Sequence, residues 1–274
     1  MLFGLIWYNK KISEIGGENM LDKFASYIKE SNNIVFFGGA GVSTESGIPD
    51  FRSKDGLYNQ HDVWFDMYSP EYLLSRECLF NTPKVFYEFY RQKMDTRNIK
   101  PNTTHEVLAW LEDIGKLSAV VTQNIDGLHQ KAGSKTVYEI HGTTKRNYCP
   151  RCGKKYPENY IFECGQDIPK CECRGQIRPA VTLYGENLPT QAVDNAMKAI
   201  SEADMLIIGG TSLSVYPASS FIDYFAGKHL VVINKEKLDV HIGDDDLVFI
   251  DSLGAVFGAL AAKLKAGGEY DLFG

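Results

Sequence analysis

The chain has 274 residues, of which 44% are hydrophobic and 23% charged, a balance typical of a globular protein with one large domain or one domain with a smaller insert. The formal net charge of −6 argues against a broad nucleic-acid-binding face. No apolar run approaches the roughly 20 residues that span a bilayer, and lysines follow the apolar start, Met1 to Tyr8, in the wrong order for a secretory signal.

The first helical pattern begins at Met20, so we expect residues 1–19 to be a poorly ordered extension. From Met20 to Ser31 apolar side chains recur at helical spacing. The apolar run Ile34 to Phe37 follows and ends at Gly38-Gly39, which predicts a buried strand leading into a glycine turn.

Short apolar runs then alternate with helical patterns. The predicted strands are 118–122, 137–140, 205–208, 230–233 and 247–250, and the predicted helices are 104–114, 191–202 and 254–265. Apolar strands that alternate with helices indicate a parallel sheet covered by helices on both faces, a Rossmann-like α/β fold. Two stretches interrupt this pattern: residues 54–97, rich in aromatics and helical in character, and residues 146–179, which hold most of the cysteines. We expect them to form a smaller domain on the larger one, which comprises 20–53, 98–145 and 180–274.

The glycine turn from Gly38 to Ser43 suits a pyrophosphate, because small residues let the backbone approach it and free N–H groups at a helix start bind it. Its glycines do not fit the G-x-G-x-x-G spacing, so an ordinary tight turn is the alternative. The polar run Thr44 to Ser53 is too irregular for a helix and is typical of a loop that folds over a ligand. In this loop Arg52 faces either phosphate or solvent.

Polar side chains also follow two later strands. Gln123, Asn124 and Asp126 come after the strand that ends at 122, and the carboxyl ends of parallel strands are where ligands bind. Their amide and carboxylate groups suit a carboxamide ligand, or only close an Asx-type turn. His129 and His141 are both candidate bases, since imidazole titrates near neutrality. From position alone, a structural histidine is the more common outcome for either.

Five of the six cysteines lie within one short stretch, which favours metal ligation in a reducing compartment over a disulfide framework. Two tight pairs, Cys149 with Cys152 and Cys171 with Cys173, suit a tetrahedral zinc ion with four thiolate ligands, a closed and therefore structural site. Cys164 is an alternative ligand. Cys78 stands apart and is expected in a core.

The 14 residues from Gly39 to Arg52, GAGVSTESGIPDFR, are similar to the cofactor-binding signature of the sirtuin family of NAD-dependent protein deacetylases. The segment 122–129, TQNIDGLH, and the later pair His141-Gly142 resemble two further sirtuin motifs. In that family the histidine of the HG pair is the general base. The resemblance therefore assigns this role to His141, and makes His129 a residue that supports the pocket.

Further sirtuin-like segments are VTLYGE at 181–186, GTSL at 210–213 and INKE at 233–236, so the resemblance runs from about Met20 to about Lys265. It implies His141 and Asn124 as catalytic residues. The residues that it implies for NAD binding are Gly39, Ala40, Gly41, Ser43, Thr44, Pro49, Asp50, Phe51, Arg52, Gln123, Asn124, Ile125, Asp126, His141, Gly210, Thr211, Ser212, Ser214, Asn234, Lys235, Glu236 and Leu253. Those implied for substrate binding are Val181, Thr182, Leu183, Tyr184, Gly185, Glu186 and Val215.

The resemblance also selects Cys149, Cys152, Cys171 and Cys173 as the zinc ligands, because Arg178-Pro179 follows them as in the family. The second cysteine pair is one residue shorter than the usual sirtuin pattern. Sirtuins that remove acidic acyl groups carry Tyr-x-x-Arg in the helical insert, whereas this chain has Tyr87 and then Tyr90 at the position of the arginine. We therefore expect weak desuccinylase activity.

The chemistry that the resemblance implies is removal of an acetyl group from lysine, with its transfer to ADP-ribose and release of nicotinamide. Two alternatives remain: ADP-ribosyl transfer to protein, which uses the same cofactor site, and a zinc-ribbon module that binds a partner without catalysis. The expected partners are proteins that carry acetyl-lysine, with neither nucleic acid nor membrane, and we expect a cytoplasmic monomer.

Overall fold

The computed structural model describes residues 17–50, 56, 65, 67–214 and 216–267. Its larger part is built on a six-stranded sheet in the order β3-β2-β1-β7-β8-β9, and every neighbouring pair is parallel. The strands are β1 (Ile34–Gly38), β2 (Leu117–Thr122), β3 (Val137–Glu139), β7 (Met205–Gly209), β8 (His229–Asn234) and β9 (Leu247–Ile250). The chain leaves β1 toward β2 on one side and reaches β7 on the other, so the strand order reverses beside β1.

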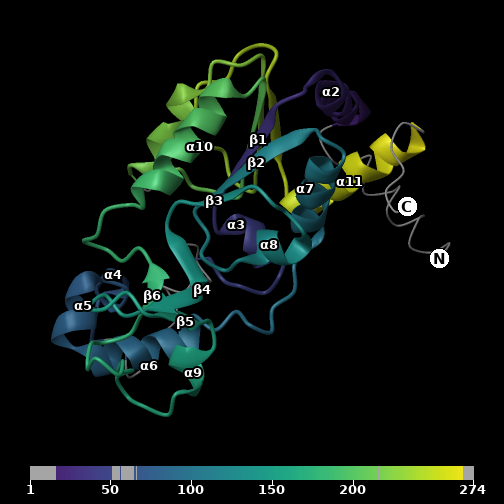
Figure 1. The fold of residues 1–274 in the computed structure, drawn as a ribbon. Coiled ribbons are helices and arrows are strands. Elements are labelled where there is room, and N and C mark those ends of the chain that lie inside the picture. The colour runs from purple at the N-terminus through teal and green to yellow at the C-terminus, as the bar shows by residue number, and fades with distance from the viewer. Residues whose placement is uncertain (1–16, 51–55, 57–64, 66, 215, 268–274) are drawn as a thin grey trace.

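Helices cover both faces of this sheet (Figure 1). One face carries α2 (Gly17–Glu30), α7 (Thr103–Asp113) and α11 (Leu253–Ala266), and the other carries α10 (Thr190–Glu202) and the 3-10 helix η2 (Ala218–Tyr224). Alternate residues of β1 supply the two cores, with Ile34 and Phe36 on the α11 side and Val35 and Phe37 on the α10 side. The predicted parallel sheet with helices on both faces is confirmed.

Within the described ranges, the smaller part combines four helices with a three-stranded antiparallel sheet in the order β5-β4-β6 (Figure 1). Its elements are α4 (Pro70–Leu73), α5 (Arg76–Asn81), α6 (Pro83–Lys93), α9 (Tyr160–Glu163), β4 (Gly142–Tyr148), β5 (Lys155–Pro157) and β6 (Arg178–Val181). Aromatic side chains of α6, together with Cys78 of α5, form a core separate from those of the large sheet. The predicted core position of Cys78 is confirmed, while the domain boundaries stay a prediction.

The observed helices begin one to three residues before the predicted ones. We expected the first helix to start at Met20, but α2 begins at Gly17; residues 1–16 of the expected extension lie outside the described residues. The helix α7 begins at Thr103 because Asn102 caps it. The first turn of such a helix is polar, so the apolar periodicity on which the prediction rested carries no signal there. Among the described residues, no helix combines the length and apolar character that crossing a bilayer requires.

Candidate active site

A cavity of about 1300 Å³ lies at the carboxyl ends of the central strands, between the large sheet and the smaller part. The loops after β1 and β7 meet at its base, where the N–H of Gly41 donates to the carbonyl oxygen of Gly210 at 2.7 Å. A Cβ atom on Gly41 would lie 2.7 Å from the Cα of Gly210, so this approach requires glycine. The strand reversal beside β1 is the position at which ligands bind in open α/β sheets.

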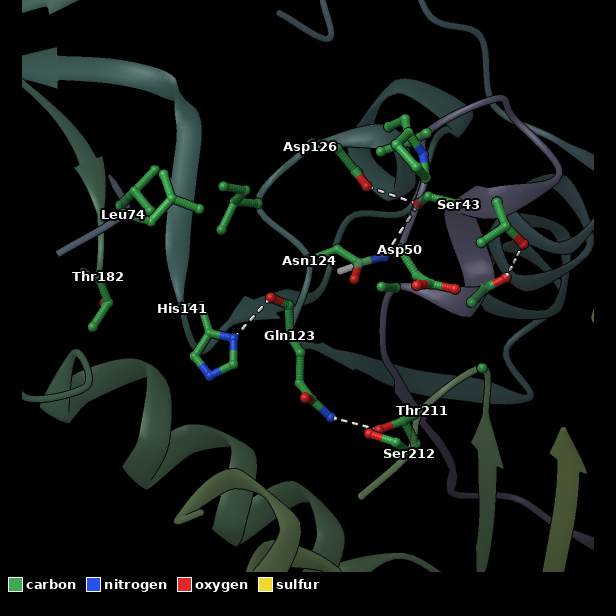
Figure 2. A pocket seen from close by; sticks show the side chains of 18 of the residues that line it. Ser43, Asp50, Leu74, Gln123, Asn124, Asp126, His141, Thr182, Thr211 and Ser212 are labelled. Carbon is green, nitrogen blue, oxygen red and sulfur yellow. Dashed lines mark hydrogen bonds between the residues drawn. The ribbon is translucent and has the colours of Figure 1, made fainter. Parts of the chain in front are cut away.

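His141 lies between β3 and β4 and lines this cavity. Its Nδ1 is 2.9 Å from the backbone carbonyl oxygen of Gln123, as Figure 2 shows. A carbonyl oxygen only accepts hydrogen bonds, so Nδ1 carries the proton and the neutral ring keeps the lone pair on Nε2. Burial lowers the pKa of His141, although the hydrogen bond to Gln123 opposes this shift. The imidazole is therefore held as a neutral base in the tautomer that accepts a proton at Nε2.

Three side chains from two loops form a hydrogen-bonded group beside His141 (Figure 2). Asn124 Nδ2 donates to Ser43 Oγ at 3.1 Å, and Ser43 Oγ donates to Asp126 Oδ2 at 2.7 Å. The other carboxylate oxygen of Asp126 accepts from the N–H of Leu128 at 2.8 Å. Burial raises the pKa of Asp126, while the bonds from Leu128 and Ser43 oppose the rise. Donors and acceptors fixed in this way can recognise a planar amide, which offers one of each.

The remaining cofactor candidates lie along the same wall of the cavity. Gln123 Nε2 donates to Thr211 Oγ1 at 3.0 Å and so connects the loops after β2 and β7. Asn234 follows β8, and its Nδ2 donates to the carbonyl oxygen of Glu236 at 2.8 Å. Leu253, at the start of α11, also lines the cavity. The structure thus brings residues from five separate predicted motifs, 39–52, 122–129, 141–142, 210–213 and 233–236, to one site.

The segment 181–186 also lines the cavity. The N–H of Thr182 donates to the carbonyl oxygen of His141 at 2.8 Å, which places this segment directly beside the candidate base. The backbone N–H of Tyr184 donates to the carbonyl oxygen of Leu74 at the end of α4, and its carbonyl oxygen accepts from the N–H of Arg76 at the start of α5. Its ring is 39% exposed and lines the cavity. An extended segment here is a surface to which a peptide can add by main-chain hydrogen bonds.

Most expected site residues line the cavity, but two do not. Gly39 lies behind it, where a Cβ would be 2.8 Å from Thr211 Cβ, so this glycine serves close packing of the loops. Ser214 is exposed, and its hydroxyl lies 2.7 Å from that of Ser212. Phe51, Arg52 and Val215 lie outside the described residues. His129 is buried in the interior and does not line the cavity, in keeping with a supporting role.

Several lining residues were missed by sequence reasoning. They are Glu45, Ile48, Leu74, Lys93, Met94, Thr96, Thr144, Asn187, Leu188, Thr190, Val193, Tyr216, Pro217, Phe221, Lys237, Leu238, Asp239 and Ser252. Glu45 lay inside the recognised signature and was detectable there, and its carboxylate accepts from the N–H of Gly254 at 2.7 Å. Leu74 and Met94 carried no motif, because an apolar residue that lines a cavity has the same sequence pattern as one in a core.

The sulfur atoms of Cys149, Cys152, Cys171 and Cys173 all lie within 4.8 Å of one another. Across the cluster, Cys149 and Cys173 are 3.5 Å apart and Cys152 and Cys171 are 3.6 Å apart. Tetrahedral zinc with Zn–S bonds of roughly 2.3 Å requires sulfur atoms separated by about 3.8 Å, so the donor set fits this metal. Cys164 is not in the cluster, and its sulfur lies near the carbonyl oxygen of Ile161 instead.

The shortened second pair is accommodated by the backbone. Arg174, directly after Cys173, adopts a left-handed conformation with φ 65°. The next residue, Gly175, lies so close to the cluster that a Cβ there would be 2.6 Å from the sulfur of Cys149. The tight turn after Cys173 therefore brings both members of the shorter pair to the cluster, and Cys164 is not needed.

Comparisons with known proteins identify the family of this chain. Residues 39–217 match the model of the Sir2 family. The chain is 51% identical over 237 residues to an NAD-dependent protein deacetylase of Clostridium acetobutylicum, covering 86% of this chain and 96% of that one. It is 52% identical over 244 residues to one of Clostridium perfringens, covering 88% and 98%.

Solved structures agree as well. A Sir2 protein with a deacetylated p53 peptide and 3'-O-acetyl ADP-ribose superposes with a TM-score of 0.80 at 34% identity, over 89% of this chain and 98% of that one. A Sir2 complex with a p53 peptide and NAD+ gives a TM-score of 0.75 at 35% identity, over 91% and 99%. The chain therefore belongs to the Sir2 family, the sirtuins.

Proposed function

We propose that this chain is an NAD-dependent protein-lysine deacetylase in which His141 is the general base. The observation that carries the proposal is the hydrogen bond from His141 Nδ1 to the carbonyl oxygen of Gln123, which directs the basic Nε2 to the proton that must be removed. The names of the bacterial relatives, and the peptide and acetyl-ADP-ribose bound in the related structures, support the same reaction.

NAD is a co-substrate in this reaction, and its ribose carbon receives the acetyl oxygen as nicotinamide leaves. The group formed by Asn124, Ser43 and Asp126 binds the carboxamide of nicotinamide, because its donors and acceptors are already fixed by one another. The glycine loops after β1 and β7 hold the pyrophosphate through backbone N–H groups. Asn234 and Glu236 bind the adenosine ribose.

On the substrate side, the segment 181–186 binds the acyl-lysine peptide as an added strand. Its proximity to His141 places the acyl group and the base on the same side of the cavity. Tyr184 and Leu74 supply an apolar wall that excludes water from the reacting centre. His141 then takes the proton of a ribose hydroxyl, and that oxygen attacks the acyl carbon. Water next adds to this carbon and its bond to the lysine nitrogen breaks, which releases the lysine peptide and O-acetyl-ADP-ribose.

Zinc at the four cysteines stabilises the smaller part and takes no part in catalysis, because four protein ligands leave no open position. We propose a cytoplasmic location, since a reducing compartment keeps such thiols available to the metal.

The direct test is mass spectrometry of the products formed from NAD and a panel of acyl-lysine peptides. Deacetylation predicts free nicotinamide, deacylated peptide and O-acetyl-ADP-ribose in equal amounts. Stable transfer of labelled ADP-ribose to protein, without these products, would instead establish ADP-ribosyl transfer.

A further inference from the structure

Asn102, the residue before α7, uses both ends of its side-chain amide. Its Oδ1 accepts from the backbone N–H of Thr104 at 3.0 Å and so caps the helix. Its Nδ2 donates to the carbonyl oxygen of Val42 at 2.8 Å and to Ser46 Oγ at 2.9 Å. Helix capping needs only an acceptor, so the two bonds donated by Nδ2 serve a different purpose.

Both acceptors belong to the segment 41–48, which we call the cofactor loop. It contains the short helix α3 (Gly41–Thr44) and the turn that follows it. A helix of four residues cannot satisfy its carbonyl groups internally, so the carbonyl of Val42 needs a partner from outside. The neighbours of Val42 and Ser46, which are Ser43 and Glu45, line the cavity. The amide of Asn102 therefore holds this loop from behind.

The same residue is also linked to the loop that follows β2. The backbone N–H of Asn102 donates to His105 Nδ1 at 3.3 Å, and the ring of His105 lies 4.7 Å from that of His129. His129 is 1% exposed and belongs to α8 (Leu128–Ala132), which begins two residues after Asp126. Burial lowers the pKa of His105 to about 4, so the ring is neutral at neutral pH. Because the N–H of Asn102 donates to Nδ1, the single ring proton is on Nε2.

We infer that Asn102 is a positioning residue for NAD: its amide group fixes the cofactor loop relative to the Asp126 loop, so that Ser43 meets Asn124 and Asp126 in a geometry ready for the ligand. This inference rests on the proposed function. It goes beyond that proposal because Asn102 does not line the cavity.

The substitution Asn102→Asp separates the two roles. Aspartate caps a helix as well as asparagine does, but it cannot donate a hydrogen bond to the carbonyl oxygen of Val42. The hydroxyl of Ser46 can still donate to the carboxylate. We expect the melting temperature of this variant to stay close to that of the wild type. The dissociation constant for ADP-ribose, measured by calorimetry, and the KM for NAD should rise about tenfold, the cost of leaving the carbonyl oxygen of Val42 without its donor. The KM for the acetyl peptide should not change.

Ser46→Ala removes one acceptor at a half-buried position without touching the cap. It should raise the KM for NAD by roughly threefold, with the same unchanged peptide KM. Wild-type affinity for ADP-ribose in Asn102→Asp would overturn the inference. So would a lowered melting temperature in Asn102→Asp combined with unchanged NAD kinetics in Ser46→Ala, because the role would then be structural.

Glu236→Ala is the control for the proposed site itself. If Glu236→Ala weakens ADP-ribose binding and Asn102→Asp does not, only the positioning role fails. If neither variant changes the binding of ADP-ribose, the cofactor does not lie in this cavity and the proposed site fails.

Discussion

Nδ1 of His141 lies 2.9 Å from the carbonyl oxygen of Gln123, and this contact connects the end of β2 to the turn before β4. The side chain of Gln123 also donates to Thr211. One residue therefore fixes the tautomer of the base and joins the loops after β2 and β7. The glycine after His141 permits this turn: Gly142 has φ 76°, and a Cβ there would collide with the carbonyl oxygen of Ala180.

The fall in activity at acid pH should reflect protonation of His141. Burial lowers its pKa below the ordinary value of 6.5, so the neutral, basic form persists to lower pH than for an exposed histidine. We expect kcat/KM for the acetyl peptide to be constant at neutral pH and to fall only below pH 6.5 as the ring gains a proton. A profile that already falls between pH 8 and pH 7 would contradict the assigned base.

The ion pair between Arg178 and Glu186 should support the substrate segment. Arg178 is 6% exposed, and its Nη2 donates to Glu186 Oε2 and to the carbonyl oxygen of Val181, both at 2.8 Å. Glu186 Oε2 also accepts from the N–H of Leu183 at 3.0 Å. Burial raises the pKa of Glu186, but its bonds from Arg178 and Leu183 outweigh this and keep the pKa below 4.5.

Glu186→Gln should therefore leave the buried guanidinium without its counter-charge. We expect a loss of about 2 kcal/mol in the free energy of unfolding, measured by urea denaturation, together with a higher KM for the acetyl peptide and an unchanged KM for NAD. Asp113→Asn is the matched control, because it removes the partner of the exposed Lys135 and should change neither quantity. Equal stabilities for the two variants would refute a supporting role.

The zinc content of cysteine variants should show which cysteines are zinc ligands. Cys173→Ala removes a ligand and should yield protein with less than one zinc ion per chain and a lower melting temperature. Cys164→Ala should keep full zinc, since its sulfur lies outside the cluster. The zinc content of both variants is measured by atomic emission. Loss of zinc in Cys164→Ala but not in Cys173→Ala would reverse the ligand assignment.

Much of this site was predictable because its parts lie in contiguous motifs at strand ends. Gln123, Asn124 and Asp126 follow an apolar strand directly, and parallel strands bring such ends together. Gly39 was expected to bind the cofactor but does not line the cavity, because a glycine that permits loop packing and one that contacts a ligand are identical in sequence. Asn102 was not found because its partners Val42 and Ser46 are far away in the chain, and a capping residue carries no sign of a second function.

The preference of the enzyme among acyl groups should depend on Tyr90, which belongs to the aromatic-rich segment 54–97. The sequence resemblance implies that Tyr90 takes the place of an arginine found in desuccinylating sirtuins. Tyr90 is 1% exposed, and no hydrogen-bond partner of its hydroxyl is found among the described residues. It therefore offers no cation to a succinyl carboxylate. We expect the rate on a succinyl-lysine peptide to be far below that on the acetyl peptide. Lys93 also lines the cavity and is a cation that could pair with the succinyl carboxylate. The variant Lys93→Met therefore shows whether Lys93 accounts for any residual turnover of the succinyl peptide. Equal rates of the wild-type protein on the succinyl and acetyl peptides would contradict the expectation.

The most direct test of the account is one assay on His141→Ala that follows two processes. Nicotinamide leaves before His141 takes its proton, so exchange of labelled nicotinamide into NAD, in the presence of acetyl peptide, should persist in the variant. Formation of O-acetyl-ADP-ribose should fall at least roughly a hundredfold, the usual contribution of a general base. Product formation at a near-normal rate in His141→Ala would contradict the central claim.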